Sequence, residues 1–309
     1  MNPDCPRCGA KGSVKHGCFH RYDDAQLIQR YRCKACGKCH SSATQAPTYR
    51  QKRRRLNRLV EMDIASSTSQ RRIAIKHGCD RRTVARKVVF LAEQARRRWK
   101  QWLDEQPPFE SVQWDELITF EHSRLKPLSV AVMSCSRTRT ILVYGVAQIP
   151  ASGQIALRSV EKYGKRANRS ASMRRRALQS IKPHLSPDAT LLSDEHPRYG
   201  AEIKQILPRV SHTQFRSKRG SLTGQGELKR IGYDPLFGIN HTLAMMRDNI
   251  KRLTRRTWCT TKKISALDDV IASLTVALPI QCLQQILNSR LLFRINSRIR
   301  RRTDFNRVS

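Results

Sequence analysis

The sequence predicts a multidomain α/β protein, in which two small N-terminal segments precede a larger core of strands and helices. Three observations support this prediction. Two matching Cys-x-x-Cys-Gly units lie near the N-terminus, a helical hairpin follows between basic runs, and strand-length apolar runs then alternate with helical stretches. The 309 residues suffice for two or three domains. We expect segments at 1–46, 47–108, 109–265 and 266–309.

The charge of the chain points to a polyanionic partner. Sixty Lys and Arg residues against 24 Asp and Glu give a formal net charge of +36 and a pI near 10.9. Each basic residue that neutralises a phosphate releases counterions, so nucleic acid is the expected partner. A merely basic protein and attraction to an anionic membrane surface are the alternatives. No apolar run reaches the roughly 18 residues of a membrane span, and the N-terminus has no apolar signal-like segment. We therefore expect a cytoplasmic protein that binds nucleic acid and no membrane.

The first segment contains the two cysteine units, CPRCG at 5–9 and CKACG at 33–37. Two such knuckles suit one tetrahedral zinc ion, with each glycine letting the backbone fold under the thiolates. The expected ligands are Cys5, Cys8, Cys33 and Cys36. A ribbon this small depends on the metal for its stability, and four thiolates leave no open position for catalysis. Cys39 is an alternative to Cys36, and the other metal-capable residues are interpreted as bystanders: Cys18, His16, His20 and His40.

The second segment reads as helix, turn, helix, with the turn at 77–79. Ser69 and Asp80 are expected to cap the two helices, and Gly78 permits the turn. The expected inward-facing residues are Ile73, Ala74, Ile75, Val84 and Val88. The second helix would then expose a set of basic residues, as a recognition helix in the major groove does: Arg81, Arg82, Arg86 and Lys87. A helical hairpin with a solvated basic face is the alternative, but the basic runs at 52–55 and 96–98 favour DNA.

The third segment begins with three apolar runs separated by short polar links, which predict antiparallel strands at 111–120, 127–135 and 140–148. Further elements are expected in the order helix, strand, helix, strand, helix. They lie at 170–185, 189–196, 199–210, 212–217 and 238–256. This order is typical of an RNase H-like core.

Two aspartates mark the predicted chemistry. Asp115 lies in the first strand and Asp194 near the end of the fourth, and in such a core these strands are neighbours. Two converging carboxylates suit Mg²⁺ or Mn²⁺, which assist phosphoryl displacement. Asp115 is preferred over Glu116, because Glu116 shares its face with Trp114, Ile118 and Phe120; Asp194 is preferred over Glu195. For either acid alone, a surface carboxylate or a helix cap is the alternative.

The late helix at 238–256 places a polar, basic set on one face: Asn240, Ala244, Arg247, Lys251 and Arg255. Its apolar residues, which are expected to pack in the core, are Leu243, Met246, Ile250 and Leu253. No glycine-rich phosphate loop is present, so ATP is not implied.

Taken together, the paired knuckles, the two aspartate strands and the segment INHTLAMMRDNIKRLTRRTWCTTKK resemble a bacterial insertion-sequence transposase of the DDE type with an N-terminal zinc ribbon, over roughly residues 1–265. The resemblance implies cleavage at the element's terminal repeats by metal-activated water, followed by attack of the freed 3′-hydroxyl on target DNA. It implies a homo-oligomer on double-stranded DNA. It also implies that Asn240 stands in the place of the third metal ligand, and that Arg247, Lys251 and Arg255 hold the phosphate backbone.

An amide at that place leaves alternatives open. An asparagine carbonyl can coordinate Mg²⁺ but brings no charge. Glu227 is a second candidate for the third ligand, and a degenerate, inactive copy is a third interpretation. A non-catalytic DNA-binding regulator is the alternative from another functional class. Residues 266–309 are expected to form covering helices and a basic tail.

Overall fold

The structure is a computed structural model that describes residues 2–216, 234–254 and 258–275. The protein is of mixed α/β type with two sheets in the described part, and it divides into two compact units, Met1–Val60 and Glu61–Ser309. Within the described ranges, no helix combines the length and the apolar character needed to cross a membrane. Glu227 and Arg255, together with most of the predicted C-terminal segment, lie outside the described residues.

The first unit is built on a small antiparallel sheet in the order β1-β2-β3. Its elements are β1 (Val14–His20), β2 (Leu27–Arg32), β3 (Cys39–Ser41) and the short helix α1 (Ser42–Gln45). Every residue of β1 is exposed, and Ile28 is the one buried apolar residue of β2. So little apolar burial cannot by itself offset the loss of chain entropy, so this unit depends on other stabilising contacts.

Three helices follow, α2 (Leu56–Ala65), α3 (Gln70–Lys76) and α4 (Arg81–Glu105), and the second unit begins within α2. Helices α3 and α4 were predicted from the sequence, and α2 was not. The predicted caps are confirmed: the Ser69 side chain accepts from the backbone N–H of Arg72, and that of Asp80 accepts from Arg82. Gly78 has the positive φ of +53° that the turn requires. Helix α4 ends where Gln106 precedes two prolines, at the predicted end of the segment 47–108.

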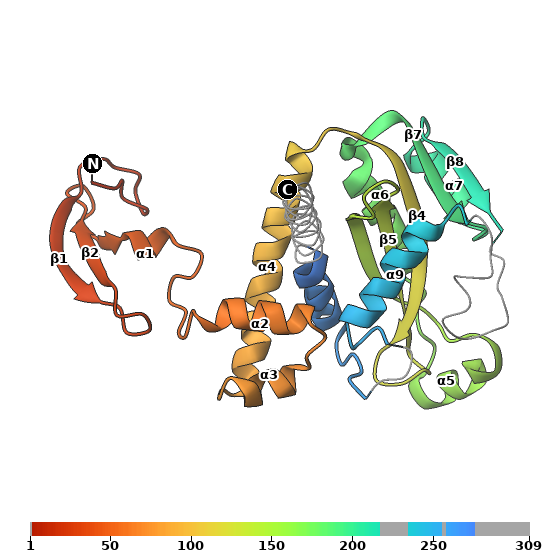
Figure 1. Ribbon diagram of the computed structural model, residues 1–309, viewed down its shortest axis with the longest axis horizontal. Coiled ribbons are helices and arrows are strands. Elements are labelled where there is room, and N and C mark those ends of the chain that lie inside the picture. The colour runs from red at the N-terminus through yellow and green to blue at the C-terminus, as the bar shows by residue number, and fades with distance from the viewer. Residues whose placement is uncertain (1, 217–233, 255–257, 276–309) are drawn as a thin grey trace, which may run out of the picture. The chain divides into compact units, whose positions relative to one another are not determined.

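The larger sheet has five strands in the order β6-β5-β4-β7-β8. Figure 1 labels four of them, β4, β5, β7 and β8. The strands are β4 (Phe109–Phe120), β5 (Pro127–Cys135), β6 (Ile141–Gln148), β7 (Leu185–Asp194) and β8 (Ser211–Phe215). The first three are antiparallel, as predicted, while β7 and β8 join parallel to β4. Strand β7 starts and ends earlier than the predicted 189–196, so Asp194 is its last residue.

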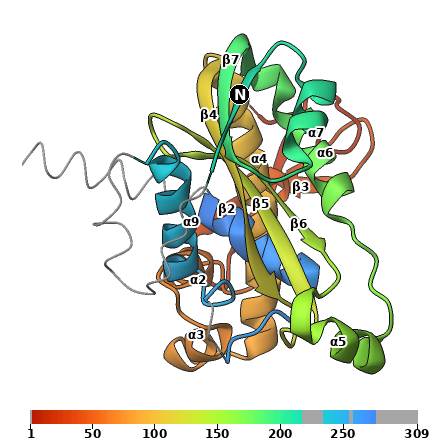
Figure 2. The ribbon, with the colours of Figure 1, turned by 90° about the vertical axis from the view of Figure 1, so that its right-hand side faces the viewer.

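Helices cover both faces of this sheet, as Figure 2 shows for α9 on one side and α6 and α7 on the other. Their bounds are η1 (Gly153–Ile155), α5 (Ala156–Tyr163), α6 (Ser170–Ile181), η2 (Lys182–His184), α7 (Tyr199–Ile206) and α9 (Phe237–Asn249), and residues 264–275 are also helical. The core on the α6 and α7 side contains Trp114, Met133, Leu178, Leu191 and Ile203. Helix α5 had no counterpart in the sequence analysis.

The predicted late helix is shorter than expected. Helix α9 ends at Asn249, and Ile250 leaves the helical conformation with φ −117° and ψ 100°. The assignment of Lys251 to the same helical face as Asn240 and Arg247 is therefore wrong. The apolar residues Leu243, Met246, Ile250 and Leu253 are all buried, as predicted, although the last two lie beyond the helix.

Candidate functional site

The N-terminal cysteines form two turns of the same geometry. In each, the glycine N–H donates to the carbonyl of the first cysteine, Gly9 to Cys5 and Gly37 to Cys33, both at 2.9 Å. The two glycines also share a positive φ, +71° and +70°. A second pair of matched bonds of 3.0 Å closes each turn from the first cysteine's N–H. Two turns of the same shape thus present two thiols each.

The four thiols converge. All ligand atoms of Cys5, Cys8, Cys33 and Cys36 lie within 4.8 Å of one another, with Cys5–Cys36 and Cys8–Cys33 sulfur distances of 3.6 Å. Backbone N–H groups of Cys8 and Arg7 lower the pKa of Cys5 to about 6, which favours the thiolate that a metal requires. The backbone N–H of Ala10 lowers the pKa of Cys8, but the neighbouring thiols of Cys36 and Cys33 raise it, to about 12 on balance, so without a metal the cluster keeps protons on some of its sulfurs. This cluster could hold a metal ion such as zinc. Cys18 and Cys39 are exposed, and His40 is bonded to Ser13 at 2.9 Å.

The helices α3 and α4 present only part of the predicted basic set. Arg81, Arg82 and Arg86 are exposed at the start of α4. Lys87 is buried, like its neighbour Val88, so its expected exposure is wrong. Ile75, expected to face inward, is 76% exposed.

Two polar anchors hold this helical region. His77 and Lys76 both contact the Asp63 carboxylate of α2, at 2.6 and 2.7 Å. Burial alone would raise the pKa of Asp63, but these two hydrogen bonds outweigh it and hold the pKa below its ordinary value. Farther along α4, the Trp99 indole N–H donates to the Leu142 carbonyl of β6. Helix α4 therefore carries the exposed arginines at its first turns and contacts the five-stranded sheet nearer its other end.

Strand β4 carries Asp115 and Glu116 on opposite faces of the sheet. The residues opposite Asp115 in β5 and β6 are Val132 and Tyr144, and those opposite Glu116 are Ala131 and Gly145. Directly opposed residues in antiparallel strands share a face. Asp115 therefore lies on the face that also carries Tyr144, whose hydroxyl bonds the Asp268 carbonyl, while Glu116 lies on the α6 face.

Glu116 is fully engaged in a buried polar network. It accepts from the Arg174 guanidinium at 3.0 Å, from the Tyr199 hydroxyl at 3.1 Å and from the Ser129 hydroxyl. Arg174, only 2% exposed, also makes a two-pronged contact with Glu202 at 2.6 and 2.7 Å. Nothing in the sequence of the helix predicted at 170–185 marks Arg174, rather than its neighbours, as a core residue.

Asp115 and Asp194 occupy neighbouring parallel strands. The register Trp114↔Ser193 continues to place the two aspartates side by side on the same face. Burial, followed by the charge of Asp194, raises the pKa of Asp115 to about 7. The charge of Glu116 adds to this rise, and the backbone N–H of Glu116 and the charge of Arg247 oppose it. Asp115 is thus buried beside a second acid, and both effects disfavour its charged form.

Helix α9 runs along β4 on this same face. The Gln113 side chain accepts from the Ile239 N–H at 2.6 Å and donates to the Pro235 carbonyl at 2.9 Å, and farther on Thr119 donates to the Arg252 carbonyl. Counting from the contact between Gln113 and Ile239, a strand advances roughly 3.3 Å per residue and a helix roughly 1.5 Å. Asp115, two residues beyond Gln113, therefore lies about level with residue 243 of α9, between Asn240 and Arg247. Gln113 escaped the sequence analysis, since nothing local marks a glutamine as a helix anchor.

Asn240 is exposed in the first turns of α9, and its side-chain nitrogen donates to Asp234 at 3.0 Å. Among the residues that the structure describes, the four-cysteine cluster is the one group in which three or more Cys, His, Asp or Glu ligand atoms meet. Asp115 and Asp194 are therefore a pair, and no third acid among the described residues joins them.

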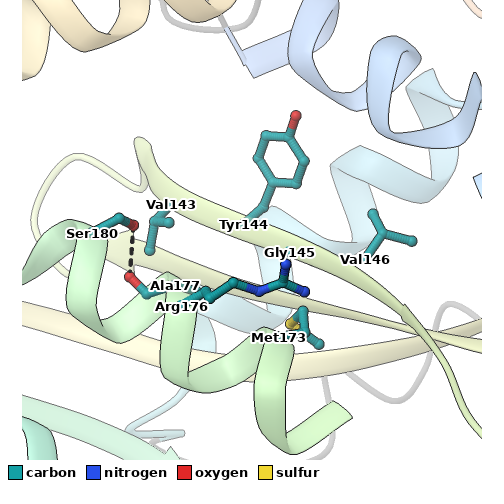
Figure 3. A pocket seen from close by; sticks show the side chains of 8 residues that line it. All are labelled: Val143, Tyr144, Gly145, Val146, Met173, Arg176, Ala177 and Ser180. Carbon is teal, nitrogen blue, oxygen red and sulfur yellow. Dashed lines mark hydrogen bonds between the residues drawn. The ribbon is translucent and has the colours of Figure 1, made fainter. Parts of the chain in front are cut away.

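A separate groove of about 340 Å³ lies between β6 and α6 (Figure 3). Helix α6 approaches closely there because Gly145 has no side chain: a Cβ at this position would stand 2.6 Å from the Met173 sulfur. Tyr144 points away from α6, toward the other face of the sheet. The groove is lined without any carboxylate, imidazole or thiol, so it lacks the groups that acid–base or metal chemistry would need.

Compared with known protein families and curated proteins, the chain matches no family model and no curated sequence. What the protein does must therefore be inferred from its residues and their geometry.

Proposed function

We propose that the protein is a DNA transposase, which binds the ends of a mobile element and catalyses metal-dependent strand cleavage and strand transfer. One observation carries this proposal: Asp115 and Asp194 lie on adjacent parallel strands, on one face, beside a helix that brings Arg247 close enough to affect the pKa of Asp115. The sequence resemblance and the net charge of +36 support a DNA substrate.

The strand order supports an RNase H-like core. Three antiparallel strands followed by two parallel ones, with the first strand central in the order β6-β5-β4-β7-β8, are what such a core has. The pair of helices α3 and α4, with exposed Arg81, Arg82 and Arg86, supports a helix-turn-helix that contacts DNA.

The donor chemistry beside β4 fits Mg²⁺ or Mn²⁺. Asp115 and Asp194 offer hard carboxylate oxygens. Burial, and after it the charge of Asp194, raises the pKa of Asp115, so a bound cation would stabilise its charged form. Bound there, the metal would supply Lewis-acid stabilisation of the phosphoryl group and a lowered pKa for the attacking water. Asn240 would add a neutral carbonyl ligand.

The chain's own residues have distinct tasks in this proposal. Arg247 lies on the Asn240 side of α9 and would contact the DNA backbone phosphate near the two aspartates. Glu116 takes no part in the chemistry, because Arg174 and Tyr199 already satisfy it. Instead it binds α6 and α7 to β4 and so keeps the strand that carries Asp115 in place.

The four N-terminal cysteines would bind a structural zinc ion. Titration of the zinc-loaded protein with a thiol-reactive mercurial, in the presence of a zinc-sensitive dye, should release about one equivalent. Release of no zinc from a protein refolded with zinc would contradict this assignment. A Cys36→Ser variant should lose the metal, whereas Cys39→Ser should retain it.

The function is tested with DNA that carries the reading frame's own flanking sequence. The labelled DNA is incubated with protein in Mg²⁺ or Mn²⁺, and nicks at the element boundary are scored. Asp194→Asn should reduce cleavage by more than the roughly 10- to 100-fold that loss of an outer-shell partner of a metal costs. Asp188→Asn, at an exposed position of the same strand, is the matched control and should cleave normally.

The remaining outcomes separate the alternatives. Binding without cleavage that is restored by Asn240→Glu would indicate a degenerate copy. Binding without cleavage in every variant and in both metals would contradict the enzyme and favour a DNA-binding regulator.

A further inference from the structure

Asp234 lies six residues before Asn240, just ahead of α9, and its carboxylate makes two contacts with the start of this helix. Oδ1 accepts from the backbone N–H of Leu236 at 2.9 Å, and Oδ2 accepts from Nδ2 of Asn240 at 3.0 Å. Leu236 is the N-cap position of α9 and has no capping side chain of its own. The carboxylate thus joins the first turn of the helix to the Asn240 amide.

This contact determines which way the amide faces. An asparagine side chain has a donor at one end and an acceptor at the other, and only the NH₂ group can face a carboxylate. Oδ1 of Asn240 is therefore turned away from Asp234. Asn240 is exposed, and Arg247 follows it by seven residues, so the two lie on the same side of α9. The charge of Arg247 acts on Asp115.

We propose that Asp234 is a positioning residue, which holds the Asn240 amide so that its oxygen is offered to a divalent cation beside Asp115 and Asp194. This inference rests on the proposed function, because it requires the cation. It accounts for the amide at position 240: a carboxylate there would face the Asp234 carboxylate at about the same 3.0 Å, with no proton between them. Asp234 would then supply the third negative charge of the site, and it would do so through its contact with the Asn240 ligand rather than by contacting the cation itself.

Three variants separate positioning from helix capping. Asp234→Ser keeps an oxygen that can cap the Leu236 N–H but is too short to reach Asn240. The exchange Asp234→Asn with Asn240→Asp rebuilds both contacts with the donor and acceptor reversed: the amide now at position 234 accepts from Leu236 and donates to the carboxylate now at position 240. Asp248→Ala, at an exposed position of the same helix, is the control for loss of an acidic residue.

The measurement is Mn²⁺ affinity of the full chain by isothermal titration calorimetry, with thermal unfolding of the metal-free protein alongside. We expect Asp234→Ser to unfold within a few degrees of the original protein yet bind Mn²⁺ about 10- to 100-fold more weakly, the range for loss of an outer-shell partner. The exchange variant should bind at least as tightly as the original protein, and Asp248→Ala should be unchanged.

Each other result overturns the proposal. Original affinity in Asp234→Ser would reduce Asp234 to a helix cap. An exchange variant no better than Asp234→Ser would make Asp234 a direct ligand. If Asp194→Asn binds Mn²⁺ as well as the original protein does, the cation site itself is wrong and the proposed function fails with it.

Discussion

Asp115 and Glu116 are neighbours on one strand, yet the surroundings of Glu116 stabilise its negative charge, whereas those of Asp115 destabilise it. Glu116 meets a buried guanidinium and two hydroxyls on the α6 face. Asp115, on the α9 face, has its pKa raised to about 7 by burial and by Asp194. A carboxylate whose charge is compensated within the fold is structural. Asp115 is instead buried beside a second acid, which disfavours its charged form, and this difference between the two carboxylates can be tested.

The largest effect is expected from breaking the compensated side. Arg174→Met leaves Glu116 and Glu202 buried without their cation, which typically costs about 3–5 kcal/mol of the free energy of unfolding. Urea denaturation of the protein, monitored by the fluorescence of its tryptophans, which all lie in the second unit, measures this loss. Arg175→Met is the matched control, since Arg175 is exposed on the same helix and should change stability by less than about 0.5 kcal/mol. Equal, small effects of both variants would contradict the network's importance.

The second prediction concerns the pH dependence that the buried Asp115 gives to stability. Because the pKa of Asp115 rises from 3.8 to about 7 on folding, the folded protein binds more protons than the unfolded chain between these values. The stability of the metal-free protein should therefore fall as pH rises from 4 to 8, by up to about 4 kcal/mol.

Asp115→Asn should remove most of this pH dependence and stabilise the metal-free protein at pH 8. Glu116→Gln should destabilise the protein at the same pH, because it weakens the contact with Arg174. Urea midpoints of the three proteins across this pH range, in the presence of EDTA, provide the measurement. If Asp115→Asn were as destabilising as Glu116→Gln at pH 8, Asp115 would be structural too.

The separation of Asp115 from Glu116, and the pairing of Asp115 with Asp194, could be predicted from the sequence, because both follow from the pattern of residues along the strands and from the order of the strands. The alternation along 111–120 separates the faces of Asp115 and Glu116, and the strand order brings Asp194 next to Asp115. The partners on each face were not accessible. Arg174 sits among three consecutive arginines, and only the packing of α6 selects which one is buried. The early end of α9 was missed because 250–254 continues a helical pattern of apolar residues that tertiary burial satisfies without a helix.

The third prediction concerns metal. If Asp115 and Asp194 hold a divalent cation, Mg²⁺ at 100 times its dissociation constant should stabilise the second unit by about 2.7 kcal/mol. Asp115→Asn should abolish this gain, whereas Glu116→Gln, although less stable, should keep it. Thermal unfolding with and without Mg²⁺ measures the difference. A gain that survives in Asp115→Asn would place the cation elsewhere.

The smallest effect concerns the contact that holds α9 on the Asp115 face of the sheet. That contact is a hydrogen bond between neutral groups, whereas the contacts on the Glu116 face are between charged groups. Gly238 lies against Gln113, and a Cβ at Gly238 would stand 2.6 Å from its Oε1. Gly238→Ala should therefore displace the glutamine from the Ile239 N–H and cost about 1–2 kcal/mol.

In a Gln113→Ala background the same substitution meets no side chain there, and alanine gains up to about 1 kcal/mol over glycine within a helix. The effect of Gly238→Ala should consequently change sign between the two backgrounds, as a double-mutant cycle by urea denaturation would record. Because the bond is between neutral groups, the coupling should be insensitive to salt. A cost of the same size in both backgrounds would mean that Gly238 is required by the helix itself and that Gln113 does not hold α9 in place.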